Sequence, residues 1–334
     1  MRLLILGGTA WLGSHLVEAA LTSGHEVTCL ARGTTSDARP GAKLVRADRN
    51  LPNAYDEVIG QHFDAVIDVS RQPGQVQGAS LALAELCNTF VFVSSASVYA
   101  DHERLDQDER AAVLPPLRAQ VMESMDQYGH AKVACEQHVL ATFGANRTFI
   151  VRAGLIGGPG DESDRTGYWP LRFAKAAESG RPVLIPDAPE LSTQVIDVRD
   201  LAGWIINRAC AAEMGIFNAT GETKSLEELI ETARVVGAHD GAVVRASSAW
   251  LLEHGVAPWM GHRSLPLWLP MEDHAGFGAR DSSAAVKAGL SRRSLEATLR
   301  DTLHWELSRR PAPAVRRAGL SDVDQASLLA ALAA

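Results

Sequence analysis

The sequence has little of what marks secreted, membrane-bound or nucleic-acid-binding proteins. Its 334 residues include four cysteines, which are far apart and form no Cys-x-x-Cys pair: Cys29, Cys87, Cys135 and Cys210. This spacing indicates neither a disulfide framework nor a zinc site and suits a reducing compartment. No apolar run approaches the roughly 20 residues that cross a bilayer, and glycines interrupt the apolar N-terminus. Neither a membrane partner nor a signal peptide is therefore predicted.

An excess of positive charge is also missing. The formal net charge is −8, and such a chain is poorly suited to neutralise a phosphate backbone, so no nucleic-acid partner is predicted. The acidic and histidine residues show no metal-ligand spacing, so no metal site is predicted either. With 46% hydrophobic and 22% charged residues, the composition is that of an ordinary globular protein. We expect a cytoplasmic protein whose partner is a small molecule.

The first motif in the sequence is a predicted strand, a glycine-rich turn and a helix at the N-terminus. Residues 2–6 form an apolar run that stops at Gly7-Gly8, and residues 14–21 follow at helical spacing. Such a turn directs backbone N–H groups and a helix N-terminus toward a pyrophosphate. Ala10 stands where many of these turns have their middle glycine, so the phosphates would lie slightly further away or rotated. A tight turn that binds no ligand is the alternative.

Strands and helices alternate through the first half of the chain. This order predicts an α/β fold, a doubly wound parallel Rossmann sheet with a smaller C-terminal α/β substrate domain. We expect the Rossmann domain at 1–165 with 197–220 returning to it, the substrate domain at 166–310, and a linker and terminal helix at 311–334. The expected strands are 2–6, 26–31, 43–47, 64–69, 89–94, 147–151, 182–186, 192–196 and 216–220. The expected helices are 75–88, 117–143, 171–179, 198–212, 226–236, 294–307 and 322–332.

The strongest catalytic signal is the pair Tyr128 and Lys132. Residues four apart share one face of a helix, and a lysine ammonium beside a phenol favours the phenolate. The tyrosine could then exchange a proton near neutral pH. Alone, such a pair usually lies on a solvated helix face, but here it follows a nucleotide-binding turn. Three serines at the carboxyl end of the preceding strand could hold a substrate carbonyl, and the residues alone do not choose among Ser94, Ser95 and Ser97.

These motifs together resemble the extended and atypical short-chain dehydrogenase/reductase superfamily, which includes the NAD-dependent epimerase/dehydratases. The resemblance extends to about Leu307 and rests on residues 7–13, 94–99, 128–132, 151–157, 194–200 and 215–221. It implies that Tyr128 is the acid/base, that Lys132 orients the ribose and that Ser95 holds the substrate oxygen. It also implies cofactor contacts from Gly7, Thr9, Ala10, Trp11, Leu12, Gly13 and Leu155. Relatives often dimerise through the helix that bears the tyrosine, so a homodimer is one expectation.

The choice of cofactor can be argued from charge. Folds that prefer NAD usually place an acidic residue at the end of the second strand, where it binds the ribose 2′-OH. Here Arg32 takes this place and could pair with a 2′-phosphate, which favours NADP over NAD. An arginine that only reaches solvent is the alternative. By the same resemblance, Asp48-Arg49 would lie near the adenine, and Val69-Ser70 would pass the second ribose.

The substrate end of the site is less clear in the sequence. The glycine-rich loop 157–165 follows a strand and should border the pocket. Our candidates for substrate contact are Arg165, Tyr168, Trp169 and Gln194. A structural loop with Trp169 in the core of the small domain is the alternative. Trp259 and Trp268 are expected in the core or in a pocket wall, and residues 101–116 in a lid or surface loop.

Three functions are compatible with these residues. The first is an NADP-dependent reductase or dehydrogenase acting on a small polar metabolite. The second is a nucleotide-sugar epimerase or dehydratase that keeps NAD bound, although residues 95–99 lack the acidic pair typical of the dehydratases. The third is a non-catalytic relative that senses cofactor or binds RNA, against which the catalytic residues and the net charge both count.

Overall fold

The large lobe is built on a seven-stranded sheet with all its strands parallel. The computed structural model describes residues 1–33, 37–309 and 315–334. The strand order is β10-β6-β5-β4-β1-β2-β3, and each neighbouring pair is parallel. The strands are β1 (Arg2–Leu6), β2 (Glu26–Ala31), β3 (Lys43–Arg46), β4 (Phe63–Asp68), β5 (Cys87–Ser95), β6 (Thr148–Ala153) and β10 (Gly215–Ala219). The predicted doubly wound Rossmann sheet is thus confirmed.

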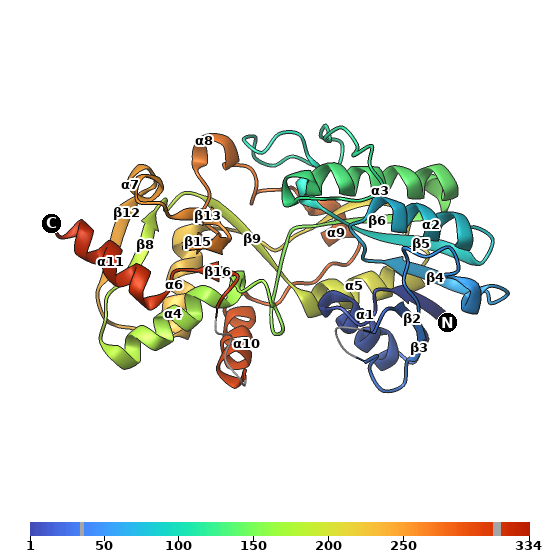
Figure 1. Cartoon of the computed structure of the whole chain (residues 1–334), viewed down its shortest axis with the longest axis horizontal. Helices are drawn as coiled ribbons and strands as arrows, with labels where there is room; N and C mark the ends of the chain where they lie inside the picture. Colours follow the sequence, from blue (N-terminus) through green and yellow to red (C-terminus); the bar gives the residue numbers. More distant parts are fainter. Residues whose placement is uncertain (34–36, 310–314) are drawn as a thin grey trace.

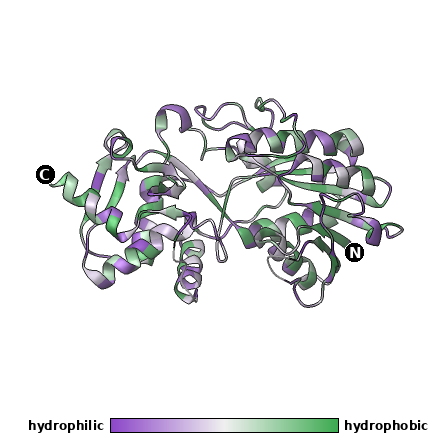
Figure 2. Ribbon diagram, viewed as in Figure 1, coloured by the Kyte–Doolittle hydropathy of each residue, from purple (hydrophilic) through white to green (hydrophobic). Residues whose placement is uncertain are grey.

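Helices cover both faces of this sheet, because its central strands are apolar on both sides (Figures 1 and 2). Leu3 and Ile5 face a core shared with α1 (Trp11–Thr22) and α5 (Val198–Cys210). Leu4 and Leu6 face the opposite core, against α2 (Pro73–Leu83) and α3 (Tyr128–Phe143). All four strand side chains are fully buried. The alternation along β1 therefore fixes which helix covers which face.

The smaller lobe has its own core, centred on Trp169 and Trp268. Its main helices are α4 (Arg165–Ser179), α6 (Leu226–Val236), α7 (Ser248–Glu253), α10 (Leu295–Ser308) and α11 (Asp322–Leu332). Its strand pairs are β8 (Val183–Asp187) with β12 (Val243–Ser247), β13 (Ala257–Trp259) with β15 (Ser264–Pro266), and β14 (Gly261–His262) with β16 (Ala318–Gly319). The short helix α8 (Met271–His274) completes it, whereas α9 (Ser283–Lys287) lies against the large lobe. No helix in the described ranges is long and apolar enough to cross a membrane.

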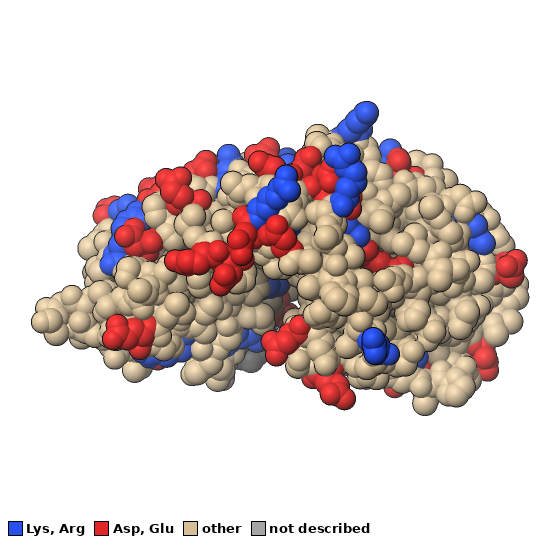
Figure 3. Space-filling view, turned by 90° about the horizontal axis from the view of Figure 1, so that it is seen from above, with Lys and Arg blue, Asp and Glu red and all other residues tan. Residues whose placement is uncertain are grey.

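A small sheet joins the lobes. Strand β9 (Ser192–Asp197) pairs with β7 (Leu155–Gly157) and β11 (Thr223–Ser225) and runs from one lobe to the other (Figure 1). The chain crosses more than once, because Ala285 of α9 and Leu290 pack into the core of the large lobe. Seen from above, the surface is hollowed between the two lobes (Figure 3).

Three predictions about local structure need correction. The helix predicted at 75–88 ends at Leu83, because residues 87–88 already belong to β5. The helix predicted at 117–143 begins only at Tyr128. The segment before it bonds to the start of α2 instead, since Gln120 accepts from the Gly74 N–H and the Met122 N–H donates to Gln72. The helix predicted at 171–179 starts earlier, at Arg165. Part of the predicted linker, 310–314, and the loop residues 34–36 lie outside the described residues.

Asp197 fastens the two lobes at the end of β9. Its side chain is 1% exposed and accepts hydrogen bonds from the Arg199 N–H and guanidinium and from Thr298 of α10. Burial alone would raise the pKa of Asp197, but the Arg199 hydrogen bonds and the charges of Arg199 and Arg293 outweigh it and lower that pKa. The carboxylate therefore stabilises the fold mainly in its charged form.

We predict that Asp197→Asn lowers the free energy of unfolding by about 2–3 kcal/mol, because it leaves Arg199 and Arg293 without this charge. Urea unfolding at pH 7 measures the change. Asp301→Asn is the matched control, since Asp301 also binds Arg199 but is 45% exposed, and it should cost less than about 1 kcal/mol. Because the folded-state pKa of Asp197 is lowered, the difference from wild type should shrink below pH ~4. Equal costs for the two variants would contradict this role.

Candidate cofactor cleft and active site

The glycine-rich turn between β1 and α1 is held by close backbone approach. Gly7 has a φ of +91°, and a Cβ on Gly13 would lie 2.1 Å from the Gly7 carbonyl oxygen. Ala10 is the N-cap of α1 and makes no side-chain capping bond, so the first N–H groups of the helix are open toward a ligand. A helix N-terminus approached this closely by a glycine turn suits a pyrophosphate.

An open cleft of about 610 Å³ lies beside this turn, at the carboxyl ends of β1 to β4. The residues that line it and were predicted to bind the cofactor are Gly7, Thr9, Ala10, Arg32, Asp48, Arg49, Val69 and Ser70. Sequence reasoning missed Gln75 and the strand ends Leu6, Leu30, Ala31, Gly33 and Ala47. Those residues carry no chemical signal, and only the sheet topology brings them here. The cleft, the glycines and the helix N-terminus together fit a dinucleotide.

Four predicted cofactor residues do not line this cleft. Gly13 acts through backbone packing, and Leu12 packs against the core. The Trp11 indole donates a hydrogen bond of 2.8 Å to the Pro159 carbonyl and so holds the loop 157–164 against the glycine turn. Leu155 packs against the core of the smaller lobe. Trp11 therefore joins the cofactor turn to the loop that leads to α4.

Arg49 is used structurally rather than as a free cation. Its guanidinium binds both oxygens of the buried Asp68 carboxylate, at 2.8 and 2.6 Å, and also reaches Tyr55 and the Gln75 carbonyl. The predicted cofactor contact is corrected for the guanidinium, which is already bonded within the protein. Arg49 nevertheless forms part of the cleft wall. The clamp ties the loop after β3 to the end of β4.

Arg32 is exposed and lines the cleft at the end of β2. The acidic residue that lines the cleft is Asp48, at the end of β3, and one of its oxygens accepts from the Asn50 N–H. The end of β2 thus presents a positive charge to the cleft.

Lys132 is buried on α3, with 3% of its surface exposed. Its ammonium donates to the carbonyl oxygens of Ser70 at 2.8 Å and Val93 at 2.6 Å. It also lies 6.0 Å from the centroid of the Tyr128 ring, one turn earlier on the helix. An ammonium has three donors, so one remains for a ligand. Lys132 thereby links the cofactor cleft, strand β5 and the tyrosine.

Tyr128 begins α3 directly against the turn that follows β5. A Cβ on the next residue, Gly129, would lie 2.3 Å from the Ser97 carbonyl oxygen, so glycine is required for this approach. Ser95 is 9% exposed, and its hydroxyl caps the turn by accepting from the Ser97 N–H at 3.1 Å. The structure therefore brings the predicted tyrosine helix and serine turn into contact.

A buried polar network supports this turn from below. Arg152 binds Glu136 with both ends of its guanidinium, at 3.1 and 2.8 Å, and Glu136 accepts from Ser94 at 2.5 Å. Burial raises the pKa of Tyr99, which keeps its hydroxyl protonated, and it donates to Asn218 at 2.6 Å. Ser94 is thus occupied with Glu136, which leaves Ser95 nearer to solvent. Sequence reasoning missed this network because its members lie on four separate segments.

The four predicted substrate residues differ in whether their side chains are available to a ligand. Trp169 is fully buried and donates to the Pro266 carbonyl, and Tyr168 is 2% exposed in the same core. Gln194 is 6% exposed, and its amide binds the Arg280 backbone and Thr223. These three predictions are corrected, because their side chains are already packed or bonded. Arg165 alone is half-buried rather than packed in the core, at the start of α4.

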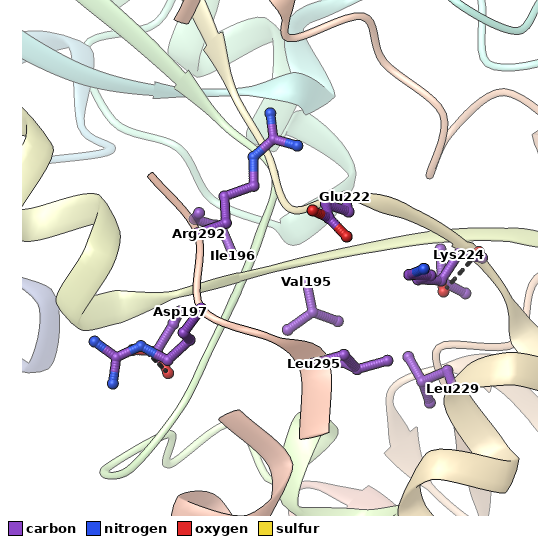
Figure 4. Close-up of a pocket in the computed structure, with 10 residues that line it drawn as sticks. Val195, Ile196, Asp197, Glu222, Lys224, Leu229, Arg292 and Leu295 are labelled. Atoms are coloured by element: carbon purple, nitrogen blue, oxygen red, sulfur yellow. Dashed lines mark hydrogen bonds and ion pairs between the residues drawn. The ribbon is translucent and has the colours of Figure 1, made fainter. Parts of the chain in front are cut away.

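A second pocket lies between β9 and the start of α10 (Figure 4). Two of its cations are engaged, since Arg293 lies 3.5 Å from Asp197 and binds Asp200 at 2.7 Å, and Lys224 lies 3.7 Å from Glu228. We assign it to the junction between the lobes rather than to ligand binding. In the described part of the chain, no group of three histidine, cysteine or acidic side chains could hold a metal ion.

Comparison with known proteins gives curated relatives that include a protein named for binding a stem-loop and one named as a reductase. The chain is 29% identical over 241 residues to the chloroplast stem-loop binding protein of 41 kDa b from Arabidopsis thaliana, covering 66% of this chain and 59% of that protein. It is 27% identical over 195 residues to the 2'-dehydrokanamycin reductase of Streptomyces kanamyceticus, covering 56% and 52%. The matched region therefore spans between half and three-fifths of these relatives' length.

Solved structures share the fold. A putative epimerase from Burkholderia cenocepacia has a TM-score of 0.69 at 20% identity, covering 91% of this chain and 97% of its own. The UDP-N-acetylglucosamine 4-epimerase from Bacillus cereus has a TM-score of 0.67 at 17% identity, covering 94% and 99%. Residues 3–214 match the model of the NAD dependent epimerase/dehydratase family. The match extends over more than half of the sequence, and the chain belongs to this family.

Proposed function

We propose that this protein is an NADPH-dependent reductase, or the reverse dehydrogenase, acting on a carbonyl or alcohol of a small polar metabolite. The observation that carries the proposal is the position of Tyr128. It starts a helix packed against the Ser95 turn, and Lys132 on the same helix binds the carbonyl oxygen of Ser70, a residue of the cofactor cleft. This arrangement supports an acid/base role for Tyr128 beside the proposed dinucleotide site.

The chain's own residues would divide the work as follows. When bound, the nicotinamide supplies a hydride to the carbonyl carbon. Tyr128 would donate the proton of its hydroxyl to the carbonyl oxygen, which completes the alcohol. Lys132 would favour the resulting phenolate and hold the nearby ribose, and Ser95 would donate a hydrogen bond to the same oxygen. The Trp11 bond to Pro159 would keep the loop 157–164 closed over the cleft.

Arg32 supports NADPH as the cofactor. Its exposed guanidinium stands at the cleft wall where a ribose 2′-phosphate would add charge-assisted hydrogen bonds. A 2′-hydroxyl would gain little from it. The 2'-dehydrokanamycin reductase is a relative named for a reduction, which agrees with this direction of reaction.

Two other functions remain to be separated from this one. The structural neighbours include a nucleotide-sugar epimerase, and an epimerase that keeps NAD bound would carry it through purification. Native mass spectrometry of the purified protein distinguishes the two, because a reductase should be empty and bind added NADPH. The Arabidopsis relative is named for binding a stem-loop. Here acidic and basic side chains are interspersed on the face shown in Figure 3, and the net charge is −8, which disfavours an RNA role.

We predict that Tyr128→Phe lowers kcat by about 10²- to 10⁴-fold because it removes the proton donor. NADPH binding, measured by fluorescence titration, should stay close to wild type. Tyr168→Phe is the matched control, since it removes a hydroxyl from a tyrosine packed in the core of the smaller lobe, and it should keep its activity. Full activity in Tyr128→Phe would refute the acid/base assignment.

We further predict that Arg32→Ala weakens NADPH binding by about 10- to 50-fold, because the 2′-phosphate loses a charged donor. The dissociation constant for NADH should change by less than about threefold, which makes NADH the internal control. Isothermal titration of both nucleotides on both proteins checks this. Tighter binding of NADH than NADPH by the wild type would contradict the NADPH preference.

A further inference from the structure

Arg165 is a cation that lacks a carboxylate partner in the described part of the chain. It begins α4, and its Nε donates to Ser163 at 3.0 Å. The nearest acidic groups are engaged elsewhere, since Asp161 accepts from Thr166, and Asp164 binds Arg309 at 2.7 Å. Burial lowers the pKa of Arg165, and the negative charge of Asp161 offsets this only in part. Half-buried guanidinium groups usually have an anion beside them.

Trp259 forms a platform next to this cation. The Arg165 guanidinium lies 5.3 Å from the centroid of its ring, and Phe277 packs edge-on against it at 5.1 Å. The indole is half-exposed, although Trp268 in the same segment is fully buried. The backbone N–H of Trp259 donates to the Trp268 carbonyl at 3.0 Å. A flat apolar surface is therefore available beside a charged one.

The backbone of this segment is strained. Trp259 has a φ of +67°, and Arg263 and Leu267 nearby are also positive. Non-glycine residues rarely adopt this conformation, and bulky ones least of all. Where such conformations persist they cluster at active sites and ligand clamps. The smaller lobe therefore holds the Trp259 backbone in place at a conformational cost.

We infer that the substrate is an acidic carbonyl compound, with its carboxylate or phosphate on Arg165 and its flat face, where it has one, on Trp259. The inference rests on the proposed function, because Tyr128 defines where the reacting carbonyl lies. Arg165 begins α4 directly after the loop 157–164, and the Trp11 bond to Pro159 holds this loop against the glycine turn. An acidic group bound to Arg165 would therefore lie on the side of the smaller lobe that meets the cofactor turn. An arginine fork suits both kinds of oxyanion, since it can bind either with two parallel hydrogen bonds.

The test measures binding without turnover, on Tyr128→Phe protein loaded with NADPH. Two pairs of probes differ in charge: benzoylformate with its methyl ester, and dihydroxyacetone phosphate with dihydroxyacetone. The acid of at least one pair should bind about 10- to 100-fold more tightly than its neutral partner. Introducing Arg165→Gln should abolish that difference, and Arg165→Lys should restore part of it. Arg181→Gln removes the same charge from an exposed residue beyond α4 and should change nothing.

Several outcomes would overturn the inference. Equal affinity within both pairs, or no binding of either acid at millimolar concentration, would do so. An equal loss of affinity for acid and neutral probes in Arg165→Gln would also overturn it. Such a loss would mean that Arg165 binds the reacting carbonyl oxygen, which all the probes share, rather than the acidic group. These measurements involve no hydride transfer. The inference can therefore fail while the Tyr128→Phe kinetics support the reductase, and the reverse.

Trp259→Gly tests the platform separately. Glycine tolerates the positive φ, so this variant should fold with a melting temperature no lower than that of Trp259→Phe. Benzoylformate should bind about 3- to 10-fold more weakly, because it has a ring to stack, and dihydroxyacetone phosphate should not. Trp259→Phe should recover most of the loss. Equal losses for both acids would contradict the platform.

Discussion

The site depends on one buried ammonium. Lys132 has almost no exposed surface, and its positive charge is held by the carbonyl oxygens of Ser70 and Val93. These carbonyls follow β4 and lie within β5, so a single side chain fixes the distance between two strand ends and the helix that carries Tyr128. A buried charge without such partners would be costly. The positions of the two strand ends and of α3 around Lys132 are therefore fixed relative to one another, as the proposed proton transfer would require.

Charge pairing is distributed unevenly over the rest of the molecule. Several buried or half-buried arginines each bind a carboxylate: Arg49 has Asp68, Arg152 has Glu136, and Arg199 has Asp197. Others in the described ranges have no carboxylate, and the buried Arg280 binds the Asp101 carbonyl and His102 instead. Arg165 belongs to this second group and lies beside the Trp259 ring. In the proposed function, the large lobe would hold the cofactor and the smaller lobe would select the substrate.

Much of the large lobe could be predicted because its signals are local. Short apolar runs predicted the strands of the sheet, and the first two dozen residues predicted the turn and helix of the cofactor cleft. The helix at 117–143 was predicted too long, because residues such as Gln120 and Met122 bond to the start of α2 rather than to their own neighbours. Tertiary hydrogen bonds outweighed local propensity there.

The sequence by itself determined the Rossmann architecture, the glycine turn and the spacing of Tyr128 and Lys132, since periodicity and a four-residue interval are properties of neighbouring residues. Only the tertiary structure decided which polar and aromatic side chains are available to a substrate. No local pattern in the sequence distinguishes Trp169 from Trp259. In the structure Trp169 is fully buried, whereas Trp259 is half-buried beside Arg165. Burial is set by what packs against a residue from distant segments, and no local pattern records it.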